Sequence, residues 1–460
     1  MAHIGIIGGG ISGLTIAWLL REKGHTVRVF EASEHTGGAM RTTRNPDGWM
    51  AEWGPNTIIE SSKRIMKLVD MLGLKEQRCY PHSQAKKRYL VRNGKPVAVP
   101  DSLRSLISTD LLTYHAKWAM IREPFIRRKK TSDIDESLAG FVRRRLGEEF
   151  LKWPIDALVG GIYAGDPEIL SVKHAFPRLA LLEQQHGSLI LGQIKGGVKR
   201  GPDSDEIPRN KARIFSFQNG MQTLPDALSG KLTDSLLTNF PITSIQRDRR
   251  YWKVTGPGDF HYNFDAVVYA GTAYGLNKIS IQKELQALLE PLINITHPPV
   301  VSLTMGFPRE NVEHPLDGFG ILVPGIENFP ILGTLFTSSL FSDRAPDKNH
   351  VTLTTYIGGM RQPDLAQKNE EQLVSLTRNT LQKLLGVHGK PHFVQSIFWP
   401  KAIPQYEMGF GHYLSLMQDA EEQNPGFFMA GNYRTGISVG DSINSAFDMA
   451  ERISRHFDQT

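Results

Sequence analysis

A glycine-rich turn close to the start of the chain constrains the fold more than any other feature. Residues 3–10, HIGIIGGG, form a short apolar run that ends in glycines, as a buried strand before a tight turn would. Residues 11–24, ISGLTIAWLLREKG, have the apolar spacing of a helix and end at a glycine, which often stops helices. Residues 25–33, HTVRVFEAS, alternate as a second strand. This order predicts a parallel βαβ unit.

The glycines of this turn indicate a dinucleotide site. Gly8, Gly10 and Gly13 have the spacing G-x-G-x-x-G between the strand and the helix. The first glycine permits the tight turn, the second lets a pyrophosphate approach the backbone, and the third allows close packing of helix and strand. Glu31 ends the second strand, where a carboxylate can bind ribose hydroxyls. NAD and FAD both fit these observations.

The composition excludes several kinds of site. Cys79 is the single cysteine of the chain, so no intrachain disulfide, cysteine zinc site or iron–sulfur cluster can form. The histidines are scattered without metal-ligand spacing, and we expect no metal. No uninterrupted apolar run reaches about twenty residues, so we expect no spanning helix. The strand at residues 3–10 leaves no room for a signal peptide, so we expect a cytoplasmic protein.

Positive charge is concentrated in one region. The net charge is +6, and residues 86–152 contain 16 Lys/Arg against 8 Asp/Glu, with clusters at residues 127–130 and 143–145. Such a region attracts acidic lipid or a carboxylate substrate, or it is simply a solvated basic face. No nucleic-acid-binding motif accompanies it, so we expect no nucleic-acid partner.

The sequence pattern predicts that residues 60–150 are mainly helical, and the alternating segments after residue 298 predict an antiparallel sheet.

Several segments resemble the signatures of the amine-oxidase-like flavoprotein superfamily. They are GGAMRT (37–42), EWGPN (52–56) and GFFMAGNYRTGISVGD (426–441). The resemblance implies that the cofactor is FAD. It places Arg41 at the diphosphate, the backbone of Ile242 at the adenine, and the helix start at Val439 and Gly440 against the N1/O2 edge of the flavin. The remaining cofactor contacts that it implies are Gly38, Gly54, Pro55, Trp399 and Gly431.

A more specific resemblance rests on GGIYAGDPEILSVKHAFPRL, residues 160–179, which contains no evident nucleophile, metal site or phosphate loop. Together with residues 81–100, 319–346, 399–406 and 430–441, it resembles the oxygen-dependent protoporphyrinogen oxidases, above all the plant mitochondrial type. The resemblance runs over nearly the whole chain. It implies oxidation of protoporphyrinogen IX to protoporphyrin IX in heme biosynthesis, with hydride transfer to flavin N5 and release of hydrogen peroxide.

The same resemblance assigns five residues to a tetrapyrrole site. Arg88 would hold a propionate, for which a guanidinium fork is well suited. Leu322 and Leu335 would sandwich a pyrrole ring, and Tyr356 would stack on the opposite face, where this family more often has Phe. Gly161 would let the macrocycle lie against bare backbone. No protein group is expected to act as a catalytic acid or base, because the flavin carries the chemistry.

The resemblance further implies an α/β fold in three parts. These are a Rossmann-like FAD-binding domain (1–85 with 205–296 and 400–460), a mixed α+β substrate-binding domain (86–95 with 297–399) and a helical membrane-binding domain (96–204). It also implies peripheral attachment to the inner face of a membrane, and a homodimer.

Two alternative functions stay open. Relatives with the same fold oxidise coproporphyrinogen III to coproporphyrin III, and their pocket should present more cations for four propionates. A flavin-less carrier related to the Rab dissociation inhibitors is the alternative from another class, against which the complete set of flavin segments argues.

Overall fold

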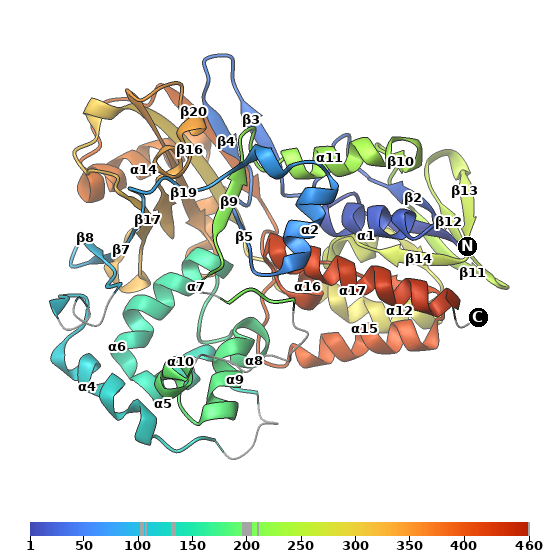
Figure 1. The fold of residues 1–460 in the computed structure, drawn as a ribbon, viewed down its shortest axis with the longest axis horizontal. Helices are drawn as coiled ribbons and strands as arrows, with labels where there is room; N and C mark the ends of the chain where they lie inside the picture. The colour runs from blue at the N-terminus through green and yellow to red at the C-terminus, as the bar shows by residue number, and fades with distance from the viewer. Residues whose placement is uncertain (102–104, 106–107, 130–134, 196–204, 209–210, 459–460) are drawn as a thin grey trace.

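The computed structural model describes the chain except for residues 102–104, 106–107, 130–134, 196–204, 209–210 and 459–460. Two sheet-based parts lie side by side, and a group of helices lies beneath the sheet that contains β16 (Val300–Pro308) and β19 (His350–Gly358) (Figure 1). The first part holds the two chain termini, as the glycine motif and the final helix predict.

A parallel five-stranded sheet forms the centre of the first part, in the order β10-β2-β1-β14-β21. Its strands are β1 (His3–Ile7), β2 (Thr26–Phe30), β10 (Leu236–Leu237), β14 (Ala266–Tyr269) and β21 (Phe427–Met429). They are almost continuously apolar because both faces of the sheet are covered. Helix α1 (Ile11–Glu22) lies alongside α17 (Val439–Asp458) on one face (Figure 1). The strands come from distant parts of the chain, so this unit is discontinuous.

Smaller sheets surround this centre. A four-stranded sheet has the order β13-β12-β11-β15, a three-stranded sheet the order β5-β9-β6, and β3 pairs with β4. Their bounds are β3 (Thr42–Arg44), β4 (Met50–Glu52), β5 (Ile58–Ile59), β6 (Arg78–Cys79), β9 (Ile214–Phe217), β11 (Ser244–Asp248), β12 (Tyr251–Thr255), β13 (His261–Phe264) and β15 (Ser280–Ile281).

A seven-stranded sheet forms the second part, in the order β20-β16-β19-β18-β17-β7-β8. Its strands are β7 (Lys87–Arg92), β8 (Lys95–Ala98), β16 (Val300–Pro308), β17 (Gly318–Leu322), β18 (Gly333–Leu335), β19 (His350–Gly358) and β20 (Phe393–Trp399). Helix α14 (Glu370–Leu385) packs its leucines on Val301 and Leu303 of one face. Thr304, Thr352 and Thr354 alternate with these residues and point to the other face, which we call the threonine face.

The predicted helical character of residues 60–150 is wrong for residues 87–98, which form the β7–β8 hairpin. The physical reason is the dipeptide at its tip: Asn93 and Gly94 have positive φ angles of 53° and 72°, as a tight hairpin turn of two residues requires. The helices that follow are α4 (Tyr114–Arg122), α5 (Leu138–Leu146), α6 (Glu148–Phe150), α7 (Asp156–Tyr163), α8 (Val172–Ala175), α9 (Pro177–His186) and α10 (Leu189–Ile194).

The other helices flank the sheets: α2 (Lys63–Met71), α11 (Thr223–Lys231), α12 (Lys283–Leu289), α13 (Thr337–Leu340), α15 (Gly411–Gln423) and α16 (Asn432–Thr435). Among the described residues, no helix has the length and apolar character that crossing a membrane requires.

Candidate functional site

The glycine turn has the geometry of a phosphate cradle. A Cβ atom on Gly13 would lie 2.0 Å from the carbonyl oxygen of Gly8, so the first turn of α1 can pack on the turn after β1 only without a side chain. Gly8 itself has a φ of 114°, which favours glycine. A Cβ on Gly10, in contrast, would meet nothing within 4 Å. The backbone at Gly10 thus faces open space at the helix N-terminus, where a pyrophosphate fits.

Glu31 is held beside this turn. One carboxylate oxygen accepts a hydrogen bond of 2.7 Å from the backbone N–H of Gly9, and the other accepts one of 2.9 Å from the N–H of Ser33. These bonds fix the carboxylate at the carboxyl end of β2, next to the glycine turn. Its position suits an acceptor for ribose hydroxyls.

The second glycine segment runs against the first. Gly37 donates a backbone hydrogen bond of 2.8 Å to the carbonyl oxygen of Gly9, and a Cβ on Gly38 would lie 3.5 Å from the Cα of Gly10. Arg41 follows, with its guanidinium carbon 3.8 Å from the centre of the Trp53 ring. This stacking holds a cation close to the glycine turns, as a diphosphate would require.

Trp53 also connects the cofactor segments to the seven-stranded sheet. Its carbonyl oxygen accepts a hydrogen bond of 2.9 Å from the indole nitrogen of Trp399, at the end of β20. Gly54 follows, where a Cβ would lie 2.7 Å from the carbonyl oxygen of Ala39. Pro55 then leads to Asn56, whose amide donates to the hydroxyl of Tyr356 on the threonine face at 2.7 Å.

The remaining predicted cofactor residues converge on the same end of the parallel sheet. Ile242 is 7% exposed, and within the described part of the chain its backbone N–H and C=O make no hydrogen bond, which leaves them for a base such as adenine. Gly431 follows β21 with a φ of 148°. Val439 and Gly440 begin α17, and Asp441 in the same turn accepts hydrogen bonds from the N–H and hydroxyl of Ser438.

Glu52 is a titratable group of this site to which we assigned no role from the sequence. It is 2% exposed at the end of β4 and accepts hydrogen bonds from the Thr42 hydroxyl at 2.6 Å and the Met221 N–H at 3.0 Å. Arg344, also buried, lies 3.5 Å from its second oxygen. Burial raises the pKa of Glu52 to about 7, although Arg344 acts in the opposite direction. Glu52 lies in the motif EWGPN, but its partners Met221 and Arg344 are too distant in the sequence for these contacts to be predicted.

Four of the five predicted substrate residues share the threonine face. Leu335 pairs with Thr354, and Tyr356 lies two residues further along β19, so both point the same way. Leu322 pairs with Gly333, the residue that also pairs with Tyr356.

Strand β7 extends this surface. Leu90 pairs with Leu322, so Arg88, two residues before Leu90, reaches the same face at its edge. The side chain of Arg88 is exposed, with its guanidinium carbon 5.9 Å from the ring centre of Phe319, and it forms no ion pair with any described residue.

Gly161 lies against this group from helix α7. A Cβ on Gly161 would come within 2.5 Å of a methyl carbon of Leu322, and Ala157 of the same helix packs with Leu90 and Leu322. The first group that a side chain at position 161 would meet is therefore Leu322. The structure thus brings the five residues together around one surface, and the Tyr356–Asn56 bond joins that surface to the cofactor segments.

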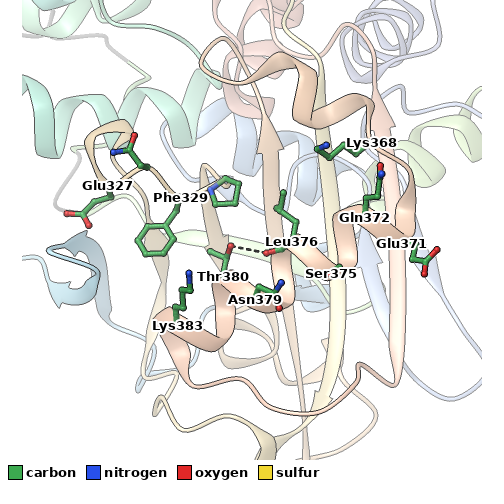
Figure 2. A pocket seen from close by; sticks show the side chains of 12 residues that line it. Glu327, Phe329, Lys368, Glu371, Gln372, Ser375, Leu376, Asn379, Thr380 and Lys383 are labelled. Atoms are coloured by element: carbon green, nitrogen blue, oxygen red, sulfur yellow. Dashed lines mark hydrogen bonds between the residues drawn. The ribbon is translucent and has the colours of Figure 1, made fainter.

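A separate cavity of about 830 Å³ lies on the opposite side of the sheet (Figure 2). It is formed by α14 and the loop around Phe329, with Lys368, Glu371 and Lys383 at its rim. None of the predicted substrate or cofactor residues lines it. Within the described residues, no group of three or more His, Cys, Asp or Glu side chains could hold a metal ion.

Comparison with known proteins matches this geometry to a family. Residues 11–454 match the family described as flavin containing amine oxidoreductase. The chain belongs to this family, and its cofactor is FAD. The glycine cradle at Gly10 fits that cofactor, as does the backbone of Ile242, which makes no hydrogen bond to any described residue.

Individual relatives indicate which kinds of enzyme in this family the chain resembles. The chain is 36% identical to protoporphyrinogen oxidase 2, chloroplastic/mitochondrial, of Arabidopsis thaliana, over 98% of this chain and 93% of that protein. It is 26% identical to coproporphyrinogen III oxidase of Bacillus subtilis, over 96% of each. A solved protein of Exiguobacterium sp. 255-15, provisionally named a protoporphyrinogen oxidase, has a TM-score of 0.80 at 22% identity and covers 98% of each chain. That structural likeness shows the fold.

Proposed function

We propose that this flavoprotein oxidises protoporphyrinogen IX to protoporphyrin IX. The observation that carries the proposal is the shared surface of Arg88, Leu322, Leu335, Tyr356 and Gly161, which adjoins the cofactor segments through Asn56. A flat, largely apolar macrocycle with anionic side chains needs such a surface. The 36% identity to the Arabidopsis protoporphyrinogen oxidase over nearly the full length supports the same substrate.

Each residue of this surface has a physical role in the proposal. Leu322 and Leu335 provide aliphatic contact for one face of a pyrrole, and the Tyr356 ring stacks on the other. Arg88 binds a propionate by charge-assisted hydrogen bonds. Gly161 lets α7 pack closely on Leu322, which holds this leucine in place against the macrocycle. Bound beside this surface, FAD supplies the acceptor for the hydride that a methylene bridge of the macrocycle gives up.

Coproporphyrinogen III is the second candidate, favoured by the identity to the Bacillus subtilis enzyme. Its two additional propionates would need additional cations. Arg92 lies on the same face of β7 as Arg88, but it is 3.2 Å from Glu149 and stacks 3.7 Å above Trp153. Arg361, behind α7, donates to backbone carbonyl oxygens. Arg88 therefore remains the cation best placed for a carboxylate, which favours protoporphyrinogen.

An anaerobic experiment tests the proposed reaction without assuming the final electron acceptor. Purified holoprotein is mixed with protoporphyrinogen IX in the absence of oxygen, and the flavin absorbance is followed. We expect the oxidised flavin band to bleach, because the first oxidation of the macrocycle passes two electrons to the flavin. Porphyrin fluorescence should rise only after an electron acceptor is admitted, since forming the porphyrin removes six electrons and so needs three flavin reductions. An unchanged flavin spectrum with excess porphyrinogen would remove this substrate.

One face of α4 and of the 3-10 turn that follows it, Glu123–Phe125, suits a membrane surface. Tyr114, Trp118, Ile121 and Phe125 follow one another at helical spacing and are 85%, 61%, 66% and 87% exposed. Exposed basic residues border this stripe at Arg122, Arg127, Arg128 and Lys129. An apolar stripe with a basic border fits the interface of an anionic bilayer. We infer that this helix attaches the protein peripherally to the inner face of a membrane, from the cytoplasmic side.

The remaining parts of the proposal rest on the family resemblance. They are molecular oxygen as the electron acceptor, hydrogen peroxide as its product, and a homodimer. The division into FAD-binding (1–85, 205–296, 400–460), substrate-binding (86–95, 297–399) and membrane-binding (96–204) parts is supported by the two separate sheets and by the group of helices α4 to α10. A flavin-less carrier is disfavoured by the family match and by the glycine cradle.

A further inference from the structure

Two charged residues fasten helix α7 to the seven-stranded sheet. The guanidinium of Arg361, three residues after β19, donates to the carbonyl oxygen of Val323 at 3.0 Å and to that of Asp156 at 2.9 Å. The carboxylate of Asp156 lies 3.5 Å from the same guanidinium and accepts a 2.6 Å hydrogen bond from the N–H of Gly325. The start of α7 and the ends of β17 and β19 are thus joined at one point.

Gly160 makes this junction possible. A Cβ atom on Gly160 would lie 2.0 Å from a terminal nitrogen of Arg361, so the guanidinium occupies the space that a side chain would need. The neighbouring Gly161 contacts Leu322 on the adjacent side of the helix. The two successive glycines of residues 160–179 therefore have different structural roles: the first admits the arginine, and the second admits the leucine.

The far end of α7 is held by the same stretch of chain. The carbonyl oxygen of Ala164 accepts a hydrogen bond of 2.7 Å from the N–H of Met360, and a Cβ on Gly359 would lie 2.6 Å from that oxygen. Residues 359–361 therefore contact both ends of the helix that carries Gly161. The side chains of Arg361 and Asp156 are only 16% and 18% exposed, so solvent screens their attraction weakly.

We propose that Arg361 and Asp156 are positioning residues, which set the separation between α7 and the threonine face and thereby the space for a planar tetrapyrrole. The proposal rests on the proposed function. A flat ring between Tyr356 and Leu322, the leucine on which Gly161 packs, tolerates little change in the position of α7, because apolar contacts weaken steeply with distance. Arg361 touches neither substrate nor cofactor in this account and acts through the helix.

Substitutions on both sides of the junction test this role. Arg361→Met removes the hydrogen bonds, and Gly160→Ala adds a methyl group where the guanidinium lies. We expect each to raise the KM for protoporphyrinogen about tenfold, since misplacing a positioning group by about 1 Å can cost up to ~100-fold. Bound FAD per chain, the flavin spectrum and kcat should stay within about twofold. In Arg361→Ala/Gly160→Ala the methyl group has room, so the combined effect on KM should be smaller than the product of the effects of Arg361→Ala and Gly160→Ala measured alone.

The controls separate positioning from general damage. Arg361→Lys retains the charge and should bring the KM part of the way back to the wild-type value. Loss of charge alone would give the same result, so the single variant Gly160→Ala, which changes space and not charge, distinguishes the two causes. Arg378→Met removes hydrogen bonds to the carbonyl of Gly389 from α14, on the other face of the sheet, and should leave KM unchanged.

Three results would overturn the inference. They are an unchanged KM in Arg361→Met, an equal rise in KM in the Arg378→Met control, or a KM in Arg361→Ala/Gly160→Ala that equals the product of the two single effects. A wild-type protein without protoporphyrinogen turnover would instead overturn the proposed function. If Arg361→Met fails to fold, Gly160→Ala and Arg361→Lys still decide the inference, because neither leaves Asp156 without a cation.

Discussion

The hydroxyl of Tyr356 accepts a hydrogen bond from the amide of Asn56 at 2.7 Å, which joins the threonine face to the segment that follows β4. The Asn56 amide also donates to the carbonyl oxygen of Gly54 at 3.2 Å. Burial raises the pKa of Tyr356 well above its ordinary value, so the phenol stays neutral at physiological pH. The surface proposed for the substrate and the segment proposed for the flavin are thus directly bonded.

Tyr356→Phe should lower the free energy of unfolding by about 1–2 kcal/mol, because the hydroxyl accepts a hydrogen bond from Asn56 at 2.7 Å and donates a longer one, of 3.5 Å, to the carbonyl oxygen of Gly54. Asn56 keeps its bond to Gly54, so the loss should stay small, and turnover should persist because the ring that stacks is retained. Urea unfolding of the holoprotein measures the change. A variant as stable as the wild type would show that the Tyr356–Asn56 bond adds nothing to stability.

The second and third glycines of the cradle should differ in what substitution by alanine does to the protein. Gly10→Ala should leave the apoprotein as stable as the wild type, because its Cβ meets no protein atom within 4 Å, yet weaken FAD binding by obstructing the pyrophosphate. Gly13→Ala should destabilise the apoprotein itself, because its Cβ would lie 2.0 Å from the Gly8 carbonyl oxygen. Thermal unfolding of the apoprotein and titration with FAD separate the two effects.

Gly230→Ala is a matched control for this pair, since its Cβ also meets nothing within 4 Å, at the end of α11. It should alter neither FAD affinity nor apoprotein stability by more than about 1 kcal/mol, the helix-propensity difference between glycine and alanine. Equal FAD affinity in Gly10→Ala and Gly230→Ala would refute the pyrophosphate assignment.

Glu52 should make stability depend on pH. In the unfolded chain this carboxyl ionises near its ordinary pKa of 4.5, whereas in the folded protein burial holds the proton until about pH 7. The folded state therefore binds more protons between these values, and the contribution of Glu52 to stability is lost as pH rises through that window. Glu52→Gln should remove this contribution. The difference in unfolding free energy between the wild type and the variant should therefore decrease as the pH rises from about 5 to about 8. Parallel plots of unfolding free energy against pH for the wild type and the variant would contradict this prediction.

Membrane attachment should depend on the apolar stripe of α4. Trp118→Asp should weaken sedimentation with anionic vesicles at least about tenfold, because it removes a large apolar side chain from the interface. Phe260→Asp, which alters an exposed aromatic residue of the first part, should have no effect. Equal binding of Trp118→Asp and wild type would remove α4 from the membrane contact.

The local features of the cofactor site could be predicted from the sequence. The spacing of Gly8, Gly10 and Gly13 fixes a turn within one βαβ unit, and Glu31 lies only one strand away. The β7–β8 hairpin could also be predicted, because Asn93-Gly94 is a strong turn signal. The basic and helical segments on either side of it indicated a helix instead.

The assembly of the substrate surface could not be predicted from local pattern. That Leu322 and Tyr356 share a face depends on strand pairing through Gly333, and a shift of one residue in that pairing would reverse it. Arg361 and Gly160 are 201 residues apart by their numbers and meet only in the folded chain. The family resemblance placed the substrate residues, but residues such as Glu52 and Arg361 became evident only from their contacts.

The most direct test compares kcat/KM for protoporphyrinogen IX and coproporphyrinogen III, read from the fluorescence of the porphyrin products. We expect a preference for protoporphyrinogen of at least about tenfold, because each additional carboxylate buried without a charged partner costs roughly 1–3 kcal/mol or more. Arg88→Ala should lower kcat/KM for protoporphyrinogen by roughly tenfold or more, the value of a hydrogen bond to a charged group. Equal or faster turnover of coproporphyrinogen, or turnover of neither substrate, would contradict the proposal that this protein oxidises protoporphyrinogen IX.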